Sequence, residues 1–388
     1  MCHTTNLDHS PRNSVGMKAA AGVCSARGAR AGLAVLLACA VISISAGTAS
    51  SHDCMPRRPR PPVVLKDMGP CRFDPLTMSF SGEPMMQAKC LMRGMDASRN
   101  LVPTLESLPA ALAERIGGDT GLPTREALSA FLSKQNLEWD FAAHLWQPLS
   151  RGNDNDPAAP MARYFVMHDT SGPSFGRRAF PADIDVNPKI NNLAQFKCSD
   201  GWGVAHVVIN RTGQMLLNHD FATPWRATKF ERAVNFAGAL KGLFVHVEMI
   251  QPRRSAGRSR WNDAQTPDPS FTSAQYDRLA LLYVIASVRA GHWLVPAFHA
   301  PIDAHIPNGH DDPLNFNIAS FAESLDGVMS KLQQMSDASS ATPAPLVAVG
   351  AAAAPSATGA LLSYDALTRE RQFHGPLQIG GGRCGGAG

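Results

Sequence analysis

The chain has 388 residues, a length that predicts two or three structural units rather than one ordinary domain. Hydrophobic residues make up 44% and charged residues 18%, which excludes wholesale disorder. The formal net charge of +4 is far below that of a dedicated nucleic-acid binder, and eight cysteines are too few for a small disulfide-stapled scaffold. With 32 glycines and 29 prolines, long loops are expected around a compact core.

Residues 1–49 predict a cleaved signal peptide. Basic side chains precede the apolar run Ala31–Ala46, and small residues follow up to Ala49. The run is shorter than the roughly 20 residues that a membrane-spanning helix requires. We therefore expect export to the periplasm or the cell exterior, without stable membrane insertion after cleavage. A retained single membrane anchor and lipidation at Cys39 are the alternatives.

Cleavage near Ala49 would leave five cysteines: Cys54, Cys71, Cys90, Cys198 and Cys384. In an oxidising compartment cysteines can pair, and an odd number leaves at least one thiol over. Cys71 and Cys90 bracket a compact stretch and are the first candidates for a disulfide. The sequence contains no CxxC pair, which disfavours a thiolate zinc knuckle.

Residues 50–158 predict a proline-rich, basic tether followed by a small accessory region. Within this region the pattern predicts one short helix over residues 105–116, which a glycine pair ends. A second helix is predicted over residues 125–135, with Thr124 as its N-cap. The turn-rich stretch 152–160 marks a boundary with the following region.

Residues 159–333 carry the patterned core. Apolar, β-branched runs predict strands at 163–167, 205–210 and 243–250. The sequence Asn-Arg-Thr-Gly at 210–213 predicts a hairpin turn, and this turn explains the glycosylation sequon that it contains.

The clearest predicted helix covers residues 272–290. Thr272 and Gln275 form a capping box, apolar side chains line one face, and a glycine follows the end. A second helix is predicted to begin at about Ile318. Residues 334–388 are rich in alanine, serine, proline and glycine, and they have no pattern that could bury a core. This tail is expected to be disordered.

Two segments of the core concentrate potential metal ligands. His168 follows a predicted strand and opens into a Gly-Pro loop, which places it at a sheet edge, although a structural histidine would fit the same pattern. The segment 299–317 holds three histidines and three aspartates among prolines, between two predicted helices. Histidine nitrogen with aspartate oxygen is a typical zinc donor set. A solvated polar loop is the alternative for this segment.

A carboxylate lies within the apolar strand predicted at 243–250. Period-two alternation puts Glu248 on one face with Phe244 and His246. A carboxylate in such a strand costs free energy unless it is paired or functional. Glu248 is therefore a candidate general base with a shifted pKa, and a structural salt bridge is the alternative.

Five stretches within residues 161–318 follow one another in a characteristic order: YFVMHDTSGP, WGVAHVVINRTGQM, VHVEMI, FTSAQYDRLALLYVIA and HAPIDAHIPNGHDDP. This order resembles the type 2 N-acetylmuramoyl-L-alanine amidases, a zinc family that includes amidase-type phage lysozymes and animal peptidoglycan-recognition proteins. The resemblance implies an α/β domain over residues 159–333, with a central mixed β-sheet flanked by helices. It covers less than half of the chain.

The resemblance also implies a zinc site. Carried over by position, it makes His168, His299 and Asp312 the ligands of Zn²⁺. Two neighbours leave the assignment open, because His305 could replace His299 and Asp311 could replace Asp312. The loop between the second and third ligands is also longer than is usual in the family.

The resemblance gives two further residues a catalytic role. Glu248 matches the family's catalytic acid, and His310 falls where many members have a lysine that stabilises the transition state. Ala205 stands where several members have a tyrosine, and Leu314 replaces a usual glycine. Neither departure removes a ligand type, so the sequence favours an active enzyme.

These features predict hydrolysis of the amide bond between N-acetylmuramic acid and L-alanine, in peptidoglycan or in released muropeptides. No nucleic-acid partner is expected, and the sequence carries no signal for an oligomeric state. Two alternatives stay open: a peptidoglycan-binding protein without turnover, and a zinc peptidase that cuts elsewhere in the stem peptide.

Overall fold

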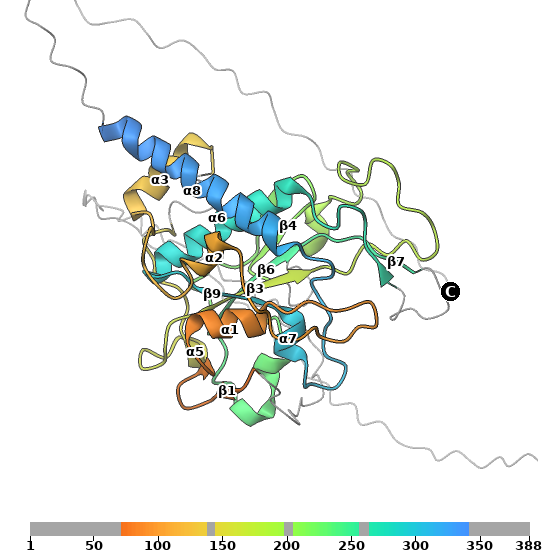
Figure 1. Ribbon diagram of the computed structural model, residues 1–388, viewed down its shortest axis with the longest axis horizontal. Helices are drawn as coiled ribbons and strands as arrows, with labels where there is room; N and C mark the ends of the chain where they lie inside the picture. Colours follow the sequence, from red (N-terminus) through yellow and green to blue (C-terminus); the bar gives the residue numbers. More distant parts are fainter. Residues whose placement is uncertain (1–70, 138–143, 198–204, 256–263, 341–388) are drawn as a thin grey trace, which may run out of the picture. The chain divides into compact units, whose positions relative to one another are not determined.

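The computed structural model describes residues 71–137, 144–197, 205–255 and 264–340, all within one compact unit that spans residues 52–388 (Figure 1). The predicted signal peptide, the proline-rich tether and residues 341–388 of the predicted tail lie outside the described residues. None of the described helices is long and apolar enough to cross a membrane.

A five-stranded mixed β-sheet forms the centre of this unit, in the order β5–β4–β6–β3–β9. The strands are β3 (Tyr164–Asp169), β4 (Val207–Ile209), β5 (Met215–Leu217), β6 (Phe244–Met249) and β9 (Val295–Phe298). β4, β6, β3 and β9 are mutually parallel, and β5 runs antiparallel to β4. The predicted α/β architecture, a mixed sheet flanked by helices, is confirmed.

Helices and short ribbons surround the sheet. The α-helices are α1 (Pro84–Leu91), α2 (Ala110–Ala113), α3 (Arg125–Lys134), α5 (Gly152–Asn155), α6 (Ser273–Ala290), α7 (His299–Asp303) and α8 (Ile318–Ser340). Three short 3₁₀ turns are η1 (Leu193–Phe196), η2 (Phe230–Arg232) and η3 (Val234–Phe236). Two-stranded ribbons pair β1 (Phe73–Asp74) with β2 (Ser79–Phe80), and β7 (Arg254–Ser255) with β8 (Ala264–Gln265).

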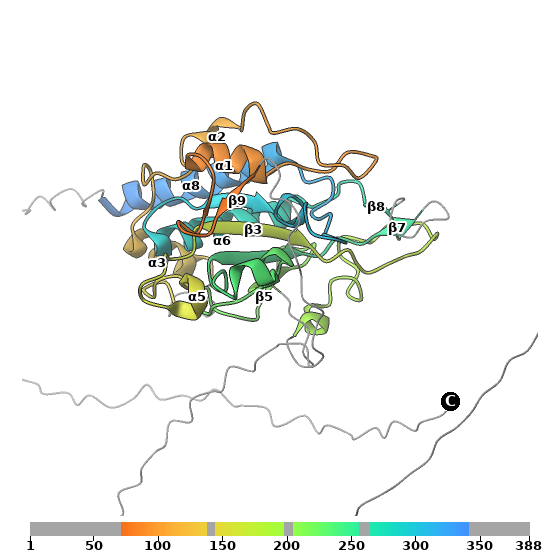
Figure 2. The ribbon, with the colours of Figure 1, turned by 90° about the horizontal axis from the view of Figure 1, so that it is seen from below.

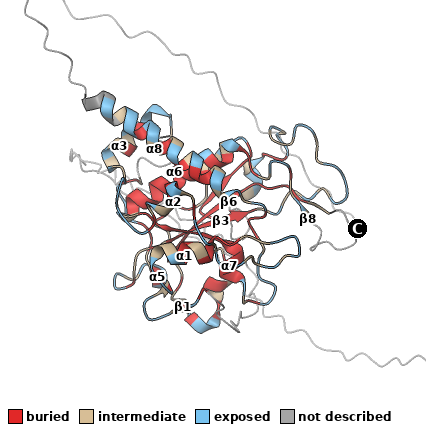
Figure 3. Cartoon of the chain, in the orientation of Figure 1, coloured by how far each residue is buried: buried red, intermediate tan, exposed pale blue. Residues whose placement is uncertain are grey.

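Helix α6 covers one face of the sheet, and α8 packs against α6 (Figure 1). Thr272 accepts a hydrogen bond from the Gln275 amide, and the Gln275 side chain accepts one from the Thr272 amide, so the predicted capping box is present. Gly291 ends α6 with a φ of 79°. Figure 3 shows the sheet and α6 as the most buried layer of the molecule. The sheet is therefore covered by helices on this side.

The N-terminal segment covers the opposite face. Side chains alternate along β3, so that Phe165 contacts Tyr283 of α6 while Tyr164 points to the other side. There Tyr164 packs edge-on against Phe80, and its hydroxyl oxygen accepts a hydrogen bond from the Phe80 amide. Helix α1 contacts β9 and α7 (Figure 2). Residues of the predicted accessory region thus belong to the same hydrophobic core as the sheet.

A disulfide joins Cys71 to Cys90, with 5.8 Å between the two Cα atoms. The pairing expected from the sequence is confirmed. Because Cys90 lies in α1, the disulfide fixes this helix to the start of the described chain. The covalent link therefore stabilises the element that packs against β9.

The helix predicted over residues 105–116 is wrong in extent, because only Ala110–Ala113 is helical. Pro109 has extended backbone angles, and proline disfavours helical conformation in the residue before it. The amide of Leu105 donates to the carbonyl of Lys89 instead of to a helical partner. The helix predicted over 125–135 is present as α3, and Thr124 accepts the expected capping bond from Ala127.

The predicted loop at 299–317 also needs correction. It begins with the short helix α7, and it follows a strand, β9, that the sequence pattern did not indicate. β9 is only four residues long and contains Pro296, which a sheet tolerates because β9 is an edge strand. The predicted tail at 334–388 likewise starts too early, since α8 continues to Ser340, shortly before the first proline beyond it.

Candidate metal centre

Two neighbouring parallel strands, β3 and β9, bring the predicted ligands together. His168 is the fifth residue of β3, and His299 directly follows β9 as the first residue of α7. Asp312 lies in the loop after α7. The carboxyl ends of parallel strands share one edge of a sheet, which is where α/β proteins commonly bind ligands. The centre thus occupies a favoured position in the fold.

The three predicted ligands are buried and converge on one point. The Nδ1 atoms of His168 and His299 are 2.9 Å apart. Asp312 Oδ1 is 3.1 Å from the Nδ1 of His299, and Asp312 Oδ2 is 3.4 Å from the Nδ1 of His168. In a tetrahedral site with metal–ligand distances of about 2.0 Å, neighbouring donors are separated by about 3.3 Å. The observed separations fit one small divalent cation.

The described part of the chain also decides between the neighbouring candidates. The groups that could hold a metal include His299 but not His305, and Asp312 but not Asp311. Asp311 instead forms an ion pair with Arg99 from the N-terminal segment. A second possible donor group combines His299 with Asp303 and His310.

Electrostatics in this pocket favour a cation. Burial and the neighbouring His299 lower the pKa of His168 to about 3, so this imidazole is neutral, as a metal ligand must be. Although burial opposes charge, Asp312 and Asp303 raise the pKa of His299 well above 6.5. The charge of His299 and contacts with His168, His299 and His310 hold the pKa of Asp312 well below 3.8, also against burial. The carboxylates thus stabilise positive charge, which a divalent cation would supply in place of a proton.

Asp303 lies behind His299 and orients it. Its carboxylate accepts a hydrogen bond from His299 Nε2 at 2.9 Å, which directs Nδ1 toward Asp312 and His168. Asp303 is fully buried and also accepts bonds from the backbone amides of Lys229 and Phe230. This role of Asp303 was not predicted from the sequence, although its i,i+4 spacing from His299 within a helical turn was a usable signal.

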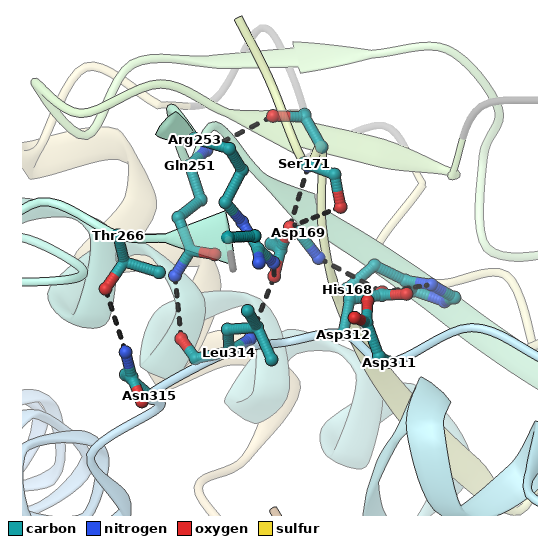
Figure 4. Close-up of polar contacts among 12 residues, drawn as sticks. His168, Asp169, Ser171, Gln251, Arg253, Thr266, Asp311, Asp312, Leu314 and Asn315 are labelled. Atoms are coloured by element: carbon teal, nitrogen blue, oxygen red, sulfur yellow. Dashed lines mark hydrogen bonds and ion pairs between the residues drawn. The ribbon is translucent and has the colours of Figure 1, made fainter. Parts of the chain in front are cut away.

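Asp169 ties the loop that carries Asp312 to strand β3 (Figure 4). Its carboxylate accepts hydrogen bonds from Arg253 at 2.5 Å, from the Ser171 amide at 2.7 Å and from the Leu314 amide at 2.9 Å. The amide of Asp169 donates to Asp312 Oδ2 at 3.3 Å. This network fixes the aspartate relative to His168, and neither Asp169 nor Arg253 stood out in the sequence.

The two predicted catalytic residues lie at the same edge of the sheet. Glu248 is the direct neighbour of His168 in the parallel β3–β6 register. Burial raises the pKa of Glu248 to about 7, and the charges of Asp312 and Asp169 add to this effect. His310 stacks on the ring of His299 with 4.3 Å between centroids, and its side chain is 50% exposed. The structure therefore brings all five predicted site residues together.

Comparison of the chain with protein-family models, with curated proteins and with solved structures found no match. A proposal for the function therefore rests on the metal centre and on the order of its residues along the chain. Its chemical content is a buried donor set of two imidazoles and one carboxylate, an adjacent carboxyl that titrates near neutrality, and an exposed imidazole at the rim.

Proposed function

We propose that the protein is a zinc-dependent amidase that hydrolyses the bond between N-acetylmuramic acid and L-alanine in peptidoglycan. The observation that carries this proposal is the convergence of His168, His299 and Asp312 beside Glu248. Their order along the chain is the order in which the type 2 amidases carry their ligands and catalytic acid. The α/β fold with a mixed sheet is consistent with that family.

Three protein ligands leave a fourth position for water or substrate, as in catalytic rather than structural zinc sites. When bound, zinc supplies Lewis acidity that polarises a carbonyl and makes water a strong nucleophile at neutral pH. Glu248, with a pKa of about 7, can take a proton from the attacking water on its carboxylate and return it to the departing amine of L-alanine. His310 can donate a hydrogen bond from its exposed ring to the oxygen of the scissile carbonyl.

We also propose that the protein is exported and acts on the cell wall from the periplasm or the cell exterior. The disulfide between Cys71 and Cys90 supports this location, because such bonds persist mainly in oxidising compartments. N-terminal sequencing of the protein from separated cell fractions tests the proposal. A cytoplasmic protein that still carries residues 1–49 would contradict it.

The amidase activity is tested by metal analysis and by mass spectrometry of products. Purified protein should contain one zinc per chain and should release stem peptides with a free L-alanine amine from purified peptidoglycan. Zinc-loaded Glu248→Gln is the matched control, since it keeps the shape of the side chain but cannot move a proton. Cleavage inside the stem peptide would identify a peptidase instead, and zinc and peptidoglycan binding without products would identify a binding protein.

A further inference from the structure

A chain of buried polar side chains leads from His168 of the metal centre through His246 of β6 to Glu231 of η2. His168 Nε2 lies 3.1 Å from His246 Nδ1, and His246 Nε2 lies 3.1 Å from a carboxylate oxygen of Glu231. His246 and Glu231 are both fully buried. Neither is needed as a ligand or as a proton carrier in the function proposed above, so their burial requires another explanation.

Glu231 is held as a hydrogen-bond acceptor. Its Oε2 atom accepts bonds from the amides of Ala227 and Thr228, at 3.0 and 2.9 Å, and from the Thr228 hydroxyl at 2.9 Å. The same hydroxyl oxygen accepts from the Glu231 amide, so its proton points to the carboxylate. An anion fixed by three donors is the strongest kind of acceptor. The proton of His246 therefore lies on Nε2, which faces Glu231.

The acceptor role of Glu231 determines which ring nitrogens of His246 and His168 carry a proton. An imidazole whose single proton lies on Nε2 presents a lone pair at Nδ1, so in this tautomer His246 Nδ1 is an acceptor. His168 Nε2 then donates to it, and the lone pair of His168 lies on Nδ1, the atom that faces His299 and Asp312. We propose that Glu231, acting through His246, sets the tautomer of His168 and so holds its Nδ1 lone pair toward the metal. The inference rests on the proposed zinc site and makes Glu231 and His246 positioning residues.

The same turn also supports the second histidine ligand. Phe230 and Lys229, which precede Glu231, donate their backbone amides to Asp303, and Asp303 accepts from His299 Nε2. Residues 227–231 therefore fix both anions that lie behind the two histidine ligands. Because one short segment anchors both, the orientations of the two imidazoles are coupled.

The test compares the affinity for Zn²⁺ and the imidazole tautomers of variants. Both carboxylate oxygens of Glu231 face His246 Nε2, Oε2 at 3.1 Å and Oε1 at 3.3 Å, and Oε2 alone accepts the three donors. In Glu231→Gln, an amide oxygen that keeps these three donors places the NH₂ group at the Oε1 position, where we expect it to donate to His246 Nε2. That arrangement moves the proton of His246 from Nε2 to Nδ1. The proton of His168 then also moves to Nδ1, where it occupies the position that would bind the metal. We expect the Kd for Zn²⁺, measured by competition with a chelator, to rise about 10- to 100-fold. Ring ¹⁵N shifts of the zinc-free variant should show both protons on Nδ1.

A matched pair at position 246 separates this role from general packing. His246→Asn keeps an acceptor oxygen close to the position of Nδ1, so the affinity for Zn²⁺ should stay within a few-fold of wild type. His246→Leu removes the acceptor and should raise the Kd about 10- to 100-fold. Asp220→Asn is the control for losing a half-buried, ion-paired carboxylate, because Asp220 pairs with Arg289 and His144 and contacts none of the proposed ligands. It should lower stability without changing the affinity for Zn²⁺.

The outcomes are distinguishable. Equal affinities of the Asn and Leu variants at position 246 would overturn the inference, even if Glu231→Gln fails to fold. Wild-type affinity and unchanged ring shifts in a folded Glu231→Gln protein would do the same. If the wild-type protein itself binds no Zn²⁺, the proposed function fails instead.

Discussion

The side chain of Glu248 combines two properties that conflict in a folded protein. It lies in a strand between buried apolar neighbours, and burial with nearby carboxylates raises its pKa to about 7. Ionisation of this group therefore costs stability, while a carboxyl that titrates near neutrality is what proton transfer at that pH requires. The protein retains a locally unfavourable residue at the place where chemistry is proposed.

This conflict predicts that Glu248→Gln increases the stability of the zinc-free protein by an amount that depends on pH. A carboxyl whose pKa is 4.5 when unfolded and about 7 when folded stabilises the fold below pH 4.5, and this contribution is lost as the pH rises through 7. The variant should therefore be more stable than wild type by about 1–3 kcal/mol at pH 8, and equal to it near pH 4. Urea unfolding with a chelator present measures both values. A constant difference at the two pH values would show that Glu248 does not titrate in this way.

The ligand assignment is tested with neighbouring residues as controls. His299→Ala and Asp312→Asn should lose zinc at micromolar concentrations, because two remaining ligands cannot form a catalytic site. His305→Ala and Asp311→Asn should keep one zinc per chain, since both side chains lie outside the donor cluster. Metal analysis after gel filtration measures the content, and loss of zinc from His305→Ala with retention in His299→Ala would reverse the assignment.

Among the elements, those with local signals were predicted well. The capping box of α6, the apolar run of β3, the alternation in β6 and the turn after β4 each depend on residues close together in the sequence. β9 was missed because it is short, contains a proline and becomes a strand only by pairing with β3. Glu231 was missed for the same reason, since its role depends on contact with a distant strand. Non-local pairing was therefore what the sequence patterns could not supply.

The attachment of helix α1 to the rest of the fold can also be tested. It packs against β9 and α7, the elements that flank His299, and the disulfide at Cys90 restrains it. Replacing both Cys71 and Cys90 by serine should lower the free energy of unfolding by about 2–4 kcal/mol, because the unfolded chain regains the freedom of the closed loop. Urea unfolding measures the loss, and unchanged stability of the double variant would mean that the bond does not form.

For the molecule as a whole, zinc should act as a stabilising ligand. A metal that binds the folded chain and not the unfolded one adds about 4 kcal/mol when its free concentration is a thousand times the Kd. We expect the midpoint of thermal unfolding to rise with added Zn²⁺ and to fall with a chelator. Asp312→Asn is the matched control and should show neither shift. An equal response of the wild type and this variant would place the bound metal elsewhere.

The separation of the ligands along the chain has a consequence for where the metal is acquired. His168 and His299 are 131 residues apart, and Asp312 follows another 13 residues later. No fragment that lacks the far end of this span contains the donor set, so the centre arises only after the sheet has closed with β9. For a chain that is exported before it folds, metal loading then takes place in the receiving compartment. If the protein is exported as proposed, the metals available there, rather than those of the cytoplasm, would decide which ion occupies the site, and the proposed hydrolytic activity would arise only outside the cytoplasm.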